Sequence, residues 1–394
     1  MLSREDNELL TRTGPGTPMG QLMRRYWLPA MLSGELETDG EPKQLQLLGQ
    51  RLVAFRDTEG RIGLLDENCP HRGASLAYGR NEECGLRCLY HGWKVDVAGN
   101  ILDTPSEPEE STLRHKIKHP AYATHEVGGV IWAYLGPAAE RPPFPAWEWT
   151  RARPEQIQVD KLLEECNYAQ GLEGSIDSVH SNFLHSRDVT GRPADHRPAL
   201  EAEDRPYGFR YAAIRKPDHD QDRLKYVRVT LFVAPCFVFT PPQRKGKDLE
   251  IITHHAFVPV DDEHNYFFSM RFNRLGALDD GHGAQFKMDE HFRPARNRDN
   301  KHLQDRAAMK AGSWTGIEGV NSQDFAMVES MGPIYDRSRE HLAATDVAII
   351  RFRRLMLALA RSGSAPVYEG YSSLAAEERM VPVGTPWQEV APCS

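Results

Sequence analysis

Two cysteines and two histidines lie close together in the sequence, in two short motifs. The motif "CPHRG" supplies Cys69 and His71, and "CLYHGW" supplies Cys88 and His91, with 16 residues between His71 and Cys88. Thiolates and imidazoles are ligands that proteins use for zinc and for iron. Because each motif offers one of each, the pattern predicts a metal centre held between two loops.

Two kinds of metal centre fit this set of ligands. A structural zinc ion accepts two cysteines and two histidines, although zinc fingers usually take both cysteines from one turn and both histidines from a helix. A [2Fe–2S] cluster with two thiolates on one iron and two imidazoles on the other explains why each loop carries one cysteine and one histidine. Gly73 and Gly92 would permit tight turns beside such a cluster. A red-brown protein would indicate the cluster, and a colourless protein would indicate zinc.

Taken together, "CPHRG" and "CLYHGW" resemble the Rieske iron–sulfur domain of the soluble oxygenases. The resemblance implies that the two cysteines and two histidines hold a [2Fe–2S] cluster. Cytochrome-complex Rieske domains have an additional cysteine five residues after the first ligand, where this chain has Ala74. We therefore interpret Cys84 as an ordinary loop residue.

A second group of metal-binding residue types follows later in the chain. The segment "IDSVHSNFLH" places Asp177, His180 and His185 within nine residues. A non-haem Fe(II) centre that activates O2 uses two histidines and one carboxylate and leaves other positions open. The five-residue spacing of the histidines does not fall on one face of an ideal helix, so we expect the helix to be distorted or to end there. Taken alone, these histidines could be ordinary surface or core residues. Beside the Rieske motif, they resemble the D-x2-H-x4-H pattern of ring-hydroxylating oxygenase large subunits.

The expected carboxylate ligand is Asp346, in "EHLAATDVAIIRFRR" at the start of a predicted helix. From the residues alone it is a first-turn aspartate that favours the helix dipole. This segment, with "QDFAMVESMGPIYDRS" before it, resembles the C-terminal signature of the phthalate dioxygenase group, in which the matching aspartate binds iron. The resemblance therefore implies that His180, His185 and Asp346 hold a mononuclear Fe(II).

The N-terminal "NELLTRTGPGTPMGQLMRRYWLPA" also resembles the opening of that group. The resemblance implies a terminal oxygenase that uses O2 to hydroxylate, and most simply to dihydroxylate, an aromatic carboxylate such as a phthalate, chlorobenzoate or phenoxybenzoate. Electrons would come from a separate NADH-dependent flavin and iron–sulfur reductase, because the chain carries no dinucleotide-binding fingerprint. Monooxygenation or O-demethylation of a methoxylated acid is the alternative at the same iron site. An electron-transfer iron–sulfur protein without oxygenase activity is the alternative of another class.

The resemblance also assigns a role to Asp177. In the family, the matching aspartate hydrogen-bonds the first iron histidine and, across a subunit boundary, the second Rieske histidine. Here it would link His180 to His91 of a neighbouring chain in a head-to-tail homotrimer, as the bridge for electrons between the two metal centres.

Binding an aromatic carboxylate requires a cation in apolar surroundings, and arginine can hold a carboxylate through two parallel hydrogen bonds. Arg210, Arg215 and Arg244 lie in strand-like segments where we expect the cavity. Of these, Arg210 and Arg244 are the predicted substrate contacts, together with Asn167 upstream of the iron ligands. Arg244, in "PPQRKGK", could instead be a solvated charge, and Asn167 could instead serve helix packing.

The surrounding pattern predicts the elements that position these residues. Residues 41–140 form short strand-like segments between Gly, Asp and Asn, which predicts a small all-β Rieske domain. In residues 141–394, strand-like segments cluster between helical ones, which predicts an α+β catalytic domain with an antiparallel sheet covered by helices. Residues 1–40 are expected to be helical and to pack on the catalytic domain.

Composition excludes several classes of partner. Lys and Arg number 48 against 56 Asp and Glu, a net charge of −8, and no long basic block is present, so we expect neither nucleic acid nor membrane as a partner. The charged N-terminus lacks the features of a signal peptide, and no run of 18 apolar residues occurs. We therefore expect a cytoplasmic protein. Six cysteines are too widely spread for a disulfide framework.

Overall fold

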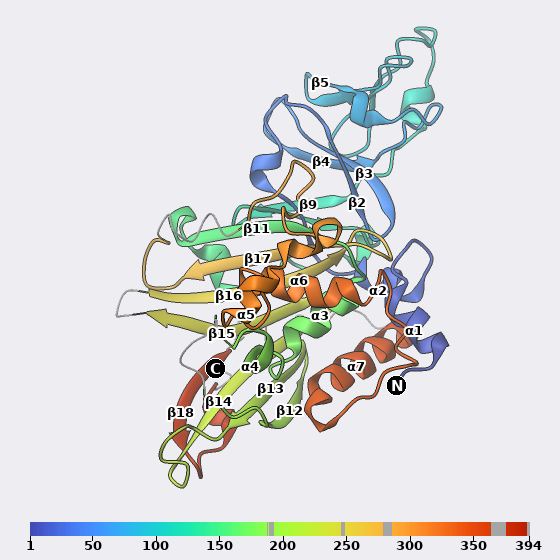
Figure 1. The fold of residues 1–394 in the computed structure, drawn as a ribbon. Coiled ribbons are helices and arrows are strands. Elements are labelled where there is room, and N and C mark those ends of the chain that lie inside the picture. The colour runs from blue at the N-terminus through green and yellow to red at the C-terminus, as the bar shows by residue number, and fades with distance from the viewer. Residues whose placement is uncertain (187, 189–192, 246–248, 279–285, 364–375, 392–394) are drawn as a thin grey trace. The chain divides into compact units, whose positions relative to one another are not determined.

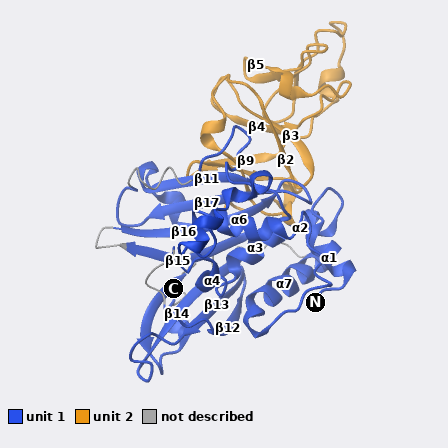
Figure 2. Ribbon diagram, viewed as in Figure 1, with its two compact units in different colours: residues 1–22, 145–394 blue, residues 23–144 orange. Residues whose placement is uncertain are grey.

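The computed structural model describes residues 1–186, 188, 193–245, 249–278, 286–363 and 376–391 (Figure 1). The chain divides into two compact units (Figure 2): a smaller one of residues 23–144, and a larger one that combines residues 1–22 with residues 145–394. Among the described residues, no helix combines the length and apolar character needed to cross a membrane.

The smaller unit consists of three small antiparallel sheets. Its strands are β1 (Leu28–Leu32), β2 (Lys43–Leu47), β3 (Gln50–Arg56), β4 (Ile62–Asp66), β5 (Arg80–Glu82), β6 (Gly85–Arg87), β7 (Lys94–Val95), β8 (Ile101–Asp103), β9 (Ala123–Val127) and β10 (Val130–Tyr134). The sheet orders are β1-β10-β9, β2-β3-β4 and β5-β6-β7-β8. Between β9 and β10, Gly128 and Gly129 both adopt positive φ, which a tight two-residue hairpin turn requires.

The core of the smaller unit surrounds the cysteines of the two motifs. Cys69 and Cys88 belong to one buried cluster with strand residues such as Phe55 and Val95 and with Trp93. Both thiols are therefore held in apolar surroundings by the strands on which they pack.

The larger unit is built on one extended antiparallel sheet. Its strands are β11 (Ile157–Glu164), β12 (Ala199–Arg205), β13 (Gly208–Arg215), β14 (Leu224–Val233), β15 (Phe237–Lys245), β16 (Leu249–Pro259), β17 (Asn265–Asn273) and β18 (Glu377–Pro382). They follow the order β11-β17-β16-β15-β14-β13-β12. Strand β14 pairs with β15 at one end and with the C-terminal strand β18 at the other.

Helices cover one face of this sheet (Figure 1). They are α1 (Arg4–Thr11), α3 (Tyr168–Ile176), α4 (Ser181–Leu184), α5 (Arg306–Lys310), α6 (Val320–Ser330) and α7 (Val347–Ser362), while α2 (Pro18–Met23) spans the sequence boundary of the two units. Helix α3 contacts β14 to β17 and also packs against α6. Its buried residues Tyr168, Leu172 and Ile176 recur every four residues, which places them on one face.

The predicted α+β class is confirmed, with a small β unit and a larger antiparallel sheet under helices. The unit boundary differs from the expected division on the N-terminal side. Residues 23–40 belong to the smaller unit because β1 pairs with β10. Only residues 1–22 join the larger unit, where the Tyr168 hydroxyl donates to the Leu10 carbonyl oxygen at 2.9 Å.

Candidate metal centres

The two cysteine–histidine loops of the smaller unit close in the same way. The Gly73 N–H donates to the Cys69 carbonyl oxygen at 2.9 Å, and the Gly92 N–H donates to the Cys88 carbonyl oxygen at 3.0 Å. The two glycines have φ of +76° and +77°, a conformation that side-chain-bearing residues adopt only with strain. Each loop is therefore closed by its own local turn, four residues after its cysteine.

The four predicted cluster ligands lie together at these loops. The Cys69 and Cys88 thiols are in contact, and the rings of His71 and His91 have their centroids 4.5 Å apart. His71 also stacks on the indole of Trp93, with ring centroids 4.7 Å apart. No described residue forms a hydrogen bond with the buried Nδ1 of His71. The loops thus bring two thiols and two imidazoles to one place, with ring nitrogen available for a metal.

Burial shifts the pKa values of two of these groups, Cys69 and His91. Burial, followed by the neighbouring Cys88, raises the pKa of the Cys69 thiol to about 11, so a bound metal must displace its proton. Desolvation and the neighbouring His71 and Arg72 lower the pKa of His91, which keeps its imidazole neutral. Two buried thiols beside two imidazoles fit a [2Fe–2S] cluster of the Rieske type.

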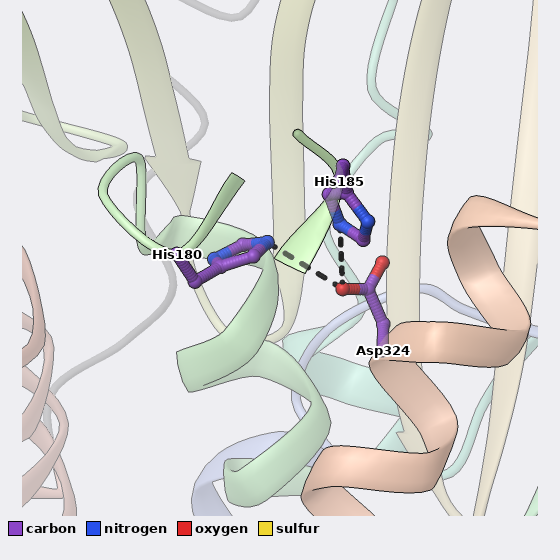
Figure 3. A group of neighbouring side chains, drawn as sticks. All are labelled: His180, His185 and Asp324. Carbon is purple, nitrogen blue, oxygen red and sulfur yellow. Dashed lines mark ion pairs between the residues drawn. The ribbon is translucent and has the colours of Figure 1, made fainter. Parts of the chain in front are cut away.

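In the larger unit, His180 and His185 meet an aspartate from another helix (Figure 3). Asp324 Oδ1 lies 3.4 Å from His180 Nε2 and 3.0 Å from His185 Nε2. One ligand atom from each of the three residues lies within 4.8 Å of the other two. Two imidazoles and one carboxylate are the protein ligands of a mononuclear non-haem iron centre, so the group fits that metal.

The local backbone explains how residues five apart converge. Helix α3 ends at Ile176, and the single turn of α4 begins at Ser181. His180 immediately precedes that turn and His185 immediately follows it. The prediction that the helix would end near the histidines is therefore confirmed. Asp324 approaches from α6, which packs against α3.

Opposite charges dominate the electrostatics of this group. Burial alone would lower the pKa of His180, but the carboxylates of Asp177 and Asp324 outweigh it and raise that pKa to about 9. Burial alone would raise the pKa of Asp324, but His180 and His185 outweigh it and lower that pKa. A divalent cation bound here would replace the shared proton and satisfy the same carboxylate.

Asp177 lies behind His180, on the side of the ring away from Asp324. Its Oδ2 is 3.5 Å from His180 Nδ1, and its Oδ1 accepts from the Val179 N–H at 2.7 Å. The contacts with His180 and Val179 lower the pKa of Asp177 although burial alone would raise it. Asp177 is therefore outside the group of three possible ligands, in the usual place of a carboxylate behind a metal-binding histidine.

The structure contradicts the assignment of Asp346 to the iron. Asp346 precedes α7, and its Oδ2 accepts a hydrogen bond from the Ala343 N–H in its own loop at 2.6 Å. Helix α7 packs on α1 and β12, whereas the histidines face α6. The carboxylate that meets them is Asp324, 22 residues earlier.

The three predicted substrate contacts are all engaged elsewhere. Asn167 caps α3, accepting from the Ala169 N–H and donating to two backbone oxygens. Arg210 pairs with Glu203 at 2.9 Å. Arg244 is partly exposed and pairs with Glu250 and Glu377. None of the contacts described for these three residues reaches His180 or His185.

The sequence patterns did not indicate Asp324 as a ligand. It lies in "QDFAMVES", within the segment that resembles the family signature, and that resemblance is the signal that could have indicated it.

Two protein-family models match the chain. A Rieske [2Fe–2S] domain model matches residues 26–121, and a model described as LigXa C-terminal domain like matches residues 133–390. The phthalate 4,5-dioxygenase oxygenase subunit of Pseudomonas putida is 43% identical, over 97% of this chain and 90% of its own length. The 3-chlorobenzoate-3,4-dioxygenase oxygenase subunit of Comamonas testosteroni is 37% identical, over 93% of this chain and 90% of its own length. The 5,5'-dehydrodivanillate O-demethylase oxygenase subunit of a Sphingobium species is 33% identical, over 91% and 80%.

Solved structures share the fold at lower sequence identity. An NdmA mutant from Pseudomonas putida CBB5 with theobromine has a TM-score of 0.66 at 18% identity, covering 88% of this chain and 93% of that one. Dicamba monooxygenase bound to dicamba has a TM-score of 0.63 at 19% identity, covering 86% and 98%. Together with the two donor sets, the family matches identify the cofactors as a Rieske [2Fe–2S] cluster and a mononuclear non-haem iron. The chain belongs to the Rieske non-haem iron oxygenases, as an oxygenase (alpha) subunit of the phthalate dioxygenase-like group.

Proposed function

We propose that this chain is the terminal oxygenase component of a system that hydroxylates an aromatic carboxylate with O2, using electrons from a separate NADH-dependent flavin and iron–sulfur reductase. Two relatives are named for phthalate and for 3-chlorobenzoate, and both compounds are aromatic carboxylates. The observation in this chain that carries the proposal is a pair of arginines, Arg215 and Arg228, beside the segment that leads into His180.

The two arginines reach the same short segment from neighbouring strands. Arg228 pairs across the sheet with Ala213, so Arg228 and Arg215 point to the same face. Arg215 Nη2 donates to the Ser178 carbonyl oxygen at 2.6 Å, and Arg228 Nη1 donates to Ser178 Oγ at 3.0 Å. Ser178 stands two residues before His180. Positive charge is therefore held close to the ligand-bearing turn.

Two hydrogen-bond donors of the Arg215 guanidinium are unsatisfied. The Arg215 residue is only 1% exposed, yet no described residue accepts a hydrogen bond from its Nε or Nη1. Burial, followed by the charge of Arg228, lowers the pKa of Arg215. Buried donors without acceptors are costly, and a carboxylate offers two oxygens in the geometry that a guanidinium matches. Glu378 lies 3.3 Å from Arg228 Nε and offsets part of the charge of Arg228. A substrate carboxylate at this position would satisfy the free donors of Arg215.

The same face of the sheet offers uncharged surroundings for an aromatic ring. Strand registers place His255 of β16 on the face that carries Arg228. Burial lowers the pKa of His255 to about 4, so its imidazole is neutral at neutral pH. Its ring lies 4.9 Å from that of Phe267, measured between centroids. This combination of cations and aromatic rings supports a substrate with a carboxylate on an apolar ring.

The two metal centres supply the redox chemistry, with O2 activation at the mononuclear iron and single electrons from the Rieske cluster. The chain's own residues hold the reactants in place. Asp177 orients His180 through Nδ1. We propose in addition that Asp177, whose side chain is 24% exposed, hydrogen-bonds His91 of a neighbouring copy in a head-to-tail homotrimer.

Addition of both oxygen atoms to the ring is the reaction we propose first, because the relatives at 43% and 37% identity are named dioxygenases. O-demethylation is the second candidate, because a relative at 33% identity is named an O-demethylase subunit. A pure electron carrier has no need of the group formed by His180, His185 and Asp324, which argues against that alternative.

The test is mass spectrometry of products formed under ¹⁸O2 with a reductase and NADH, from benzoate, phthalate, phenoxybenzoate and methoxybenzoate substrates. Two labelled oxygens in one ring product are the expected result. One label, or loss of a methyl group as formaldehyde, would favour the second candidate. Consumption of NADH and O2 without a labelled product from any acid would contradict the proposed substrate class.

A further inference from the structure

A glutamine adjacent to the iron-site aspartate in the sequence contacts His185 on the ring nitrogen away from the metal. Gln323 Oε1 lies 2.7 Å from His185 Nδ1. The amide nitrogen of Gln323 donates to Asp188 Oδ2 at 2.9 Å and to the Ile317 carbonyl oxygen at 2.8 Å. Gln323 is 1% exposed, so water does not compete for these bonds.

These partners fix which way the amide of Gln323 points. Both groups near its Nε2, the Asp188 carboxylate and the Ile317 carbonyl, are acceptors. Reversing the amide would turn its oxygen toward two acceptors and leave its N–H groups facing His185. The amide oxygen is therefore the atom presented to His185, and it can only accept. It follows that His185 Nδ1 carries a proton, which leaves Nε2 as the nitrogen that can bind a metal.

We propose that Gln323 is a positioning residue that selects the metal-binding tautomer of His185, and that Asp188 holds Gln323 in the required orientation. The inference rests on the proposed metal site of His180, His185 and Asp324. In that site, His185 Nε2 faces Asp324 and lies 3.0 Å from Asp324 Oδ1. The chain from Asp188 through Gln323 to His185 thus prepares this nitrogen to bind the metal.

The two histidines of the site are oriented by different chemistry. His180 Nδ1 faces the carboxylate of Asp177 at 3.5 Å, whereas His185 Nδ1 faces a neutral amide. A carboxylate partner increases the basicity of an imidazole more than an amide partner does. The amide fixes the tautomer of His185 without placing a negative charge in direct contact with its ring. The charge of Asp188 is separated from His185 by the side chain of Gln323.

The test is a Co(II) titration of the full chain with its Rieske cluster intact and the mononuclear metal removed. Gln323→Leu removes the acceptor, and we expect Co(II) affinity to fall about 10- to 100-fold. The matched control is Asp188→Asn, in which the new amide oxygen still accepts from Gln323 Nε2. We expect this variant to bind Co(II) about as tightly as the parent.

If Gln323 served only to pack α6, its replacement would not change Co(II) affinity in the expected pattern. Parent-like Co(II) affinity in Gln323→Leu, or a loss in Asp188→Asn as large as in Gln323→Leu, would overturn the proposal. If Gln323→Leu does not fold, ¹⁵N-histidine NMR of the Zn(II)-loaded parent decides: a proton on His185 Nδ1 supports the proposal and its absence overturns it. Unchanged Co(II) affinity in His185→Ala would overturn the metal site itself. The expected Co(II) pattern without any oxygenated product would overturn the proposed substrate class alone.

Discussion

The two metal centres of this chain are built in opposite ways. In the smaller unit, each ligand loop closes on itself through a hydrogen bond from Gly73 or Gly92. In the larger unit, Asp324 follows His185 by 139 residues and reaches it only because α6 packs against α3. When local turns hold the ligands, the spacing of the ligands along the sequence predicts the metal site. When helix packing brings the ligands together, that spacing does not predict the site.

The largest expected effect separates the two centres. Replacing Cys88 with Ser removes one thiolate, and we expect loss of the red-brown [2Fe–2S] chromophore. The mononuclear site should still bind Co(II), because all three of its ligands come from the larger unit. Visible absorbance and Co(II) titration measure the two outcomes.

The matched control is Cys84→Ser. Cys84 lies in the turn between β5 and β6, so this variant should keep the chromophore. Loss of both metals in Cys88→Ser would show that the two centres are not independent.

A second expected effect concerns communication between the centres. In Asp177→Asn the side chain keeps its size but loses its charge, so we expect turnover to fall by about 10- to 100-fold. Both metal contents should remain at the parent level, since Asp177 is not among the ligands. Product formation per cluster measures the effect, and a parent-like rate would contradict the proposed bridging role.

The substrate arginines give a third, smaller effect. Arg228→Met should raise KM for an aromatic carboxylate about 10- to 100-fold, the loss of one or two hydrogen bonds to a charged group. Arg244→Met is the control, because Arg244 also pairs with carboxylates, Glu250 and Glu377, but lacks the contact with Ser178 that Arg228 makes. Steady-state kinetics on the preferred acid compares them, and equal KM values for the two variants would argue against a role of Arg228 in carboxylate binding.

The smallest expected effect is on stability. Burial raises the pKa of Glu164 to about 8, with Asn265 opposing the shift and Glu329 and Asp324 adding to it. The folded state therefore binds more protons than the unfolded state between the ordinary glutamate pKa and about 8, so this group lowers stability as the pH rises through that window. Glu164→Gln keeps an oxygen for the Asn265 amide, which donates to Glu164 Oε2 at 2.8 Å. We expect the difference in thermal midpoint between pH 5.5 and pH 8 to become smaller in the variant. A difference as large as in the parent would show that Glu164 is already charged.

The contrast between the centres also explains what the sequence could predict. The cluster loops were predictable because a cysteine, a histidine and a glycine recur within five residues in each, and local hydrogen bonds alone determine their shape. The end of the helix near His180 was predictable from the five-residue spacing.

The rest depends on tertiary packing. Asp324 lies within helix α6, and Asp346 directly precedes helix α7. Nothing in the local sequence of either aspartate indicates which of the two helices brings its carboxylate to the histidines. The resemblance alone favoured Asp346, and only the packing of α6 and α7 separates the two. Similarly, Arg210 and Arg228 both alternate along strands and both have a carboxylate partner, Glu203 and Glu378 respectively. Only Arg228 also donates to Ser178, two residues before His180.

The iron content of Asp324→Ala and Asp346→Ala, measured beside the parent, tests the assignment of the mononuclear site most directly. We expect about three iron atoms per chain in the parent and in Asp346→Ala, two from the cluster and one from the mononuclear site. Asp324→Ala should retain about two, with an unchanged cluster spectrum. Retention of the third iron in Asp324→Ala together with its loss in Asp346→Ala would contradict the assignment of the site.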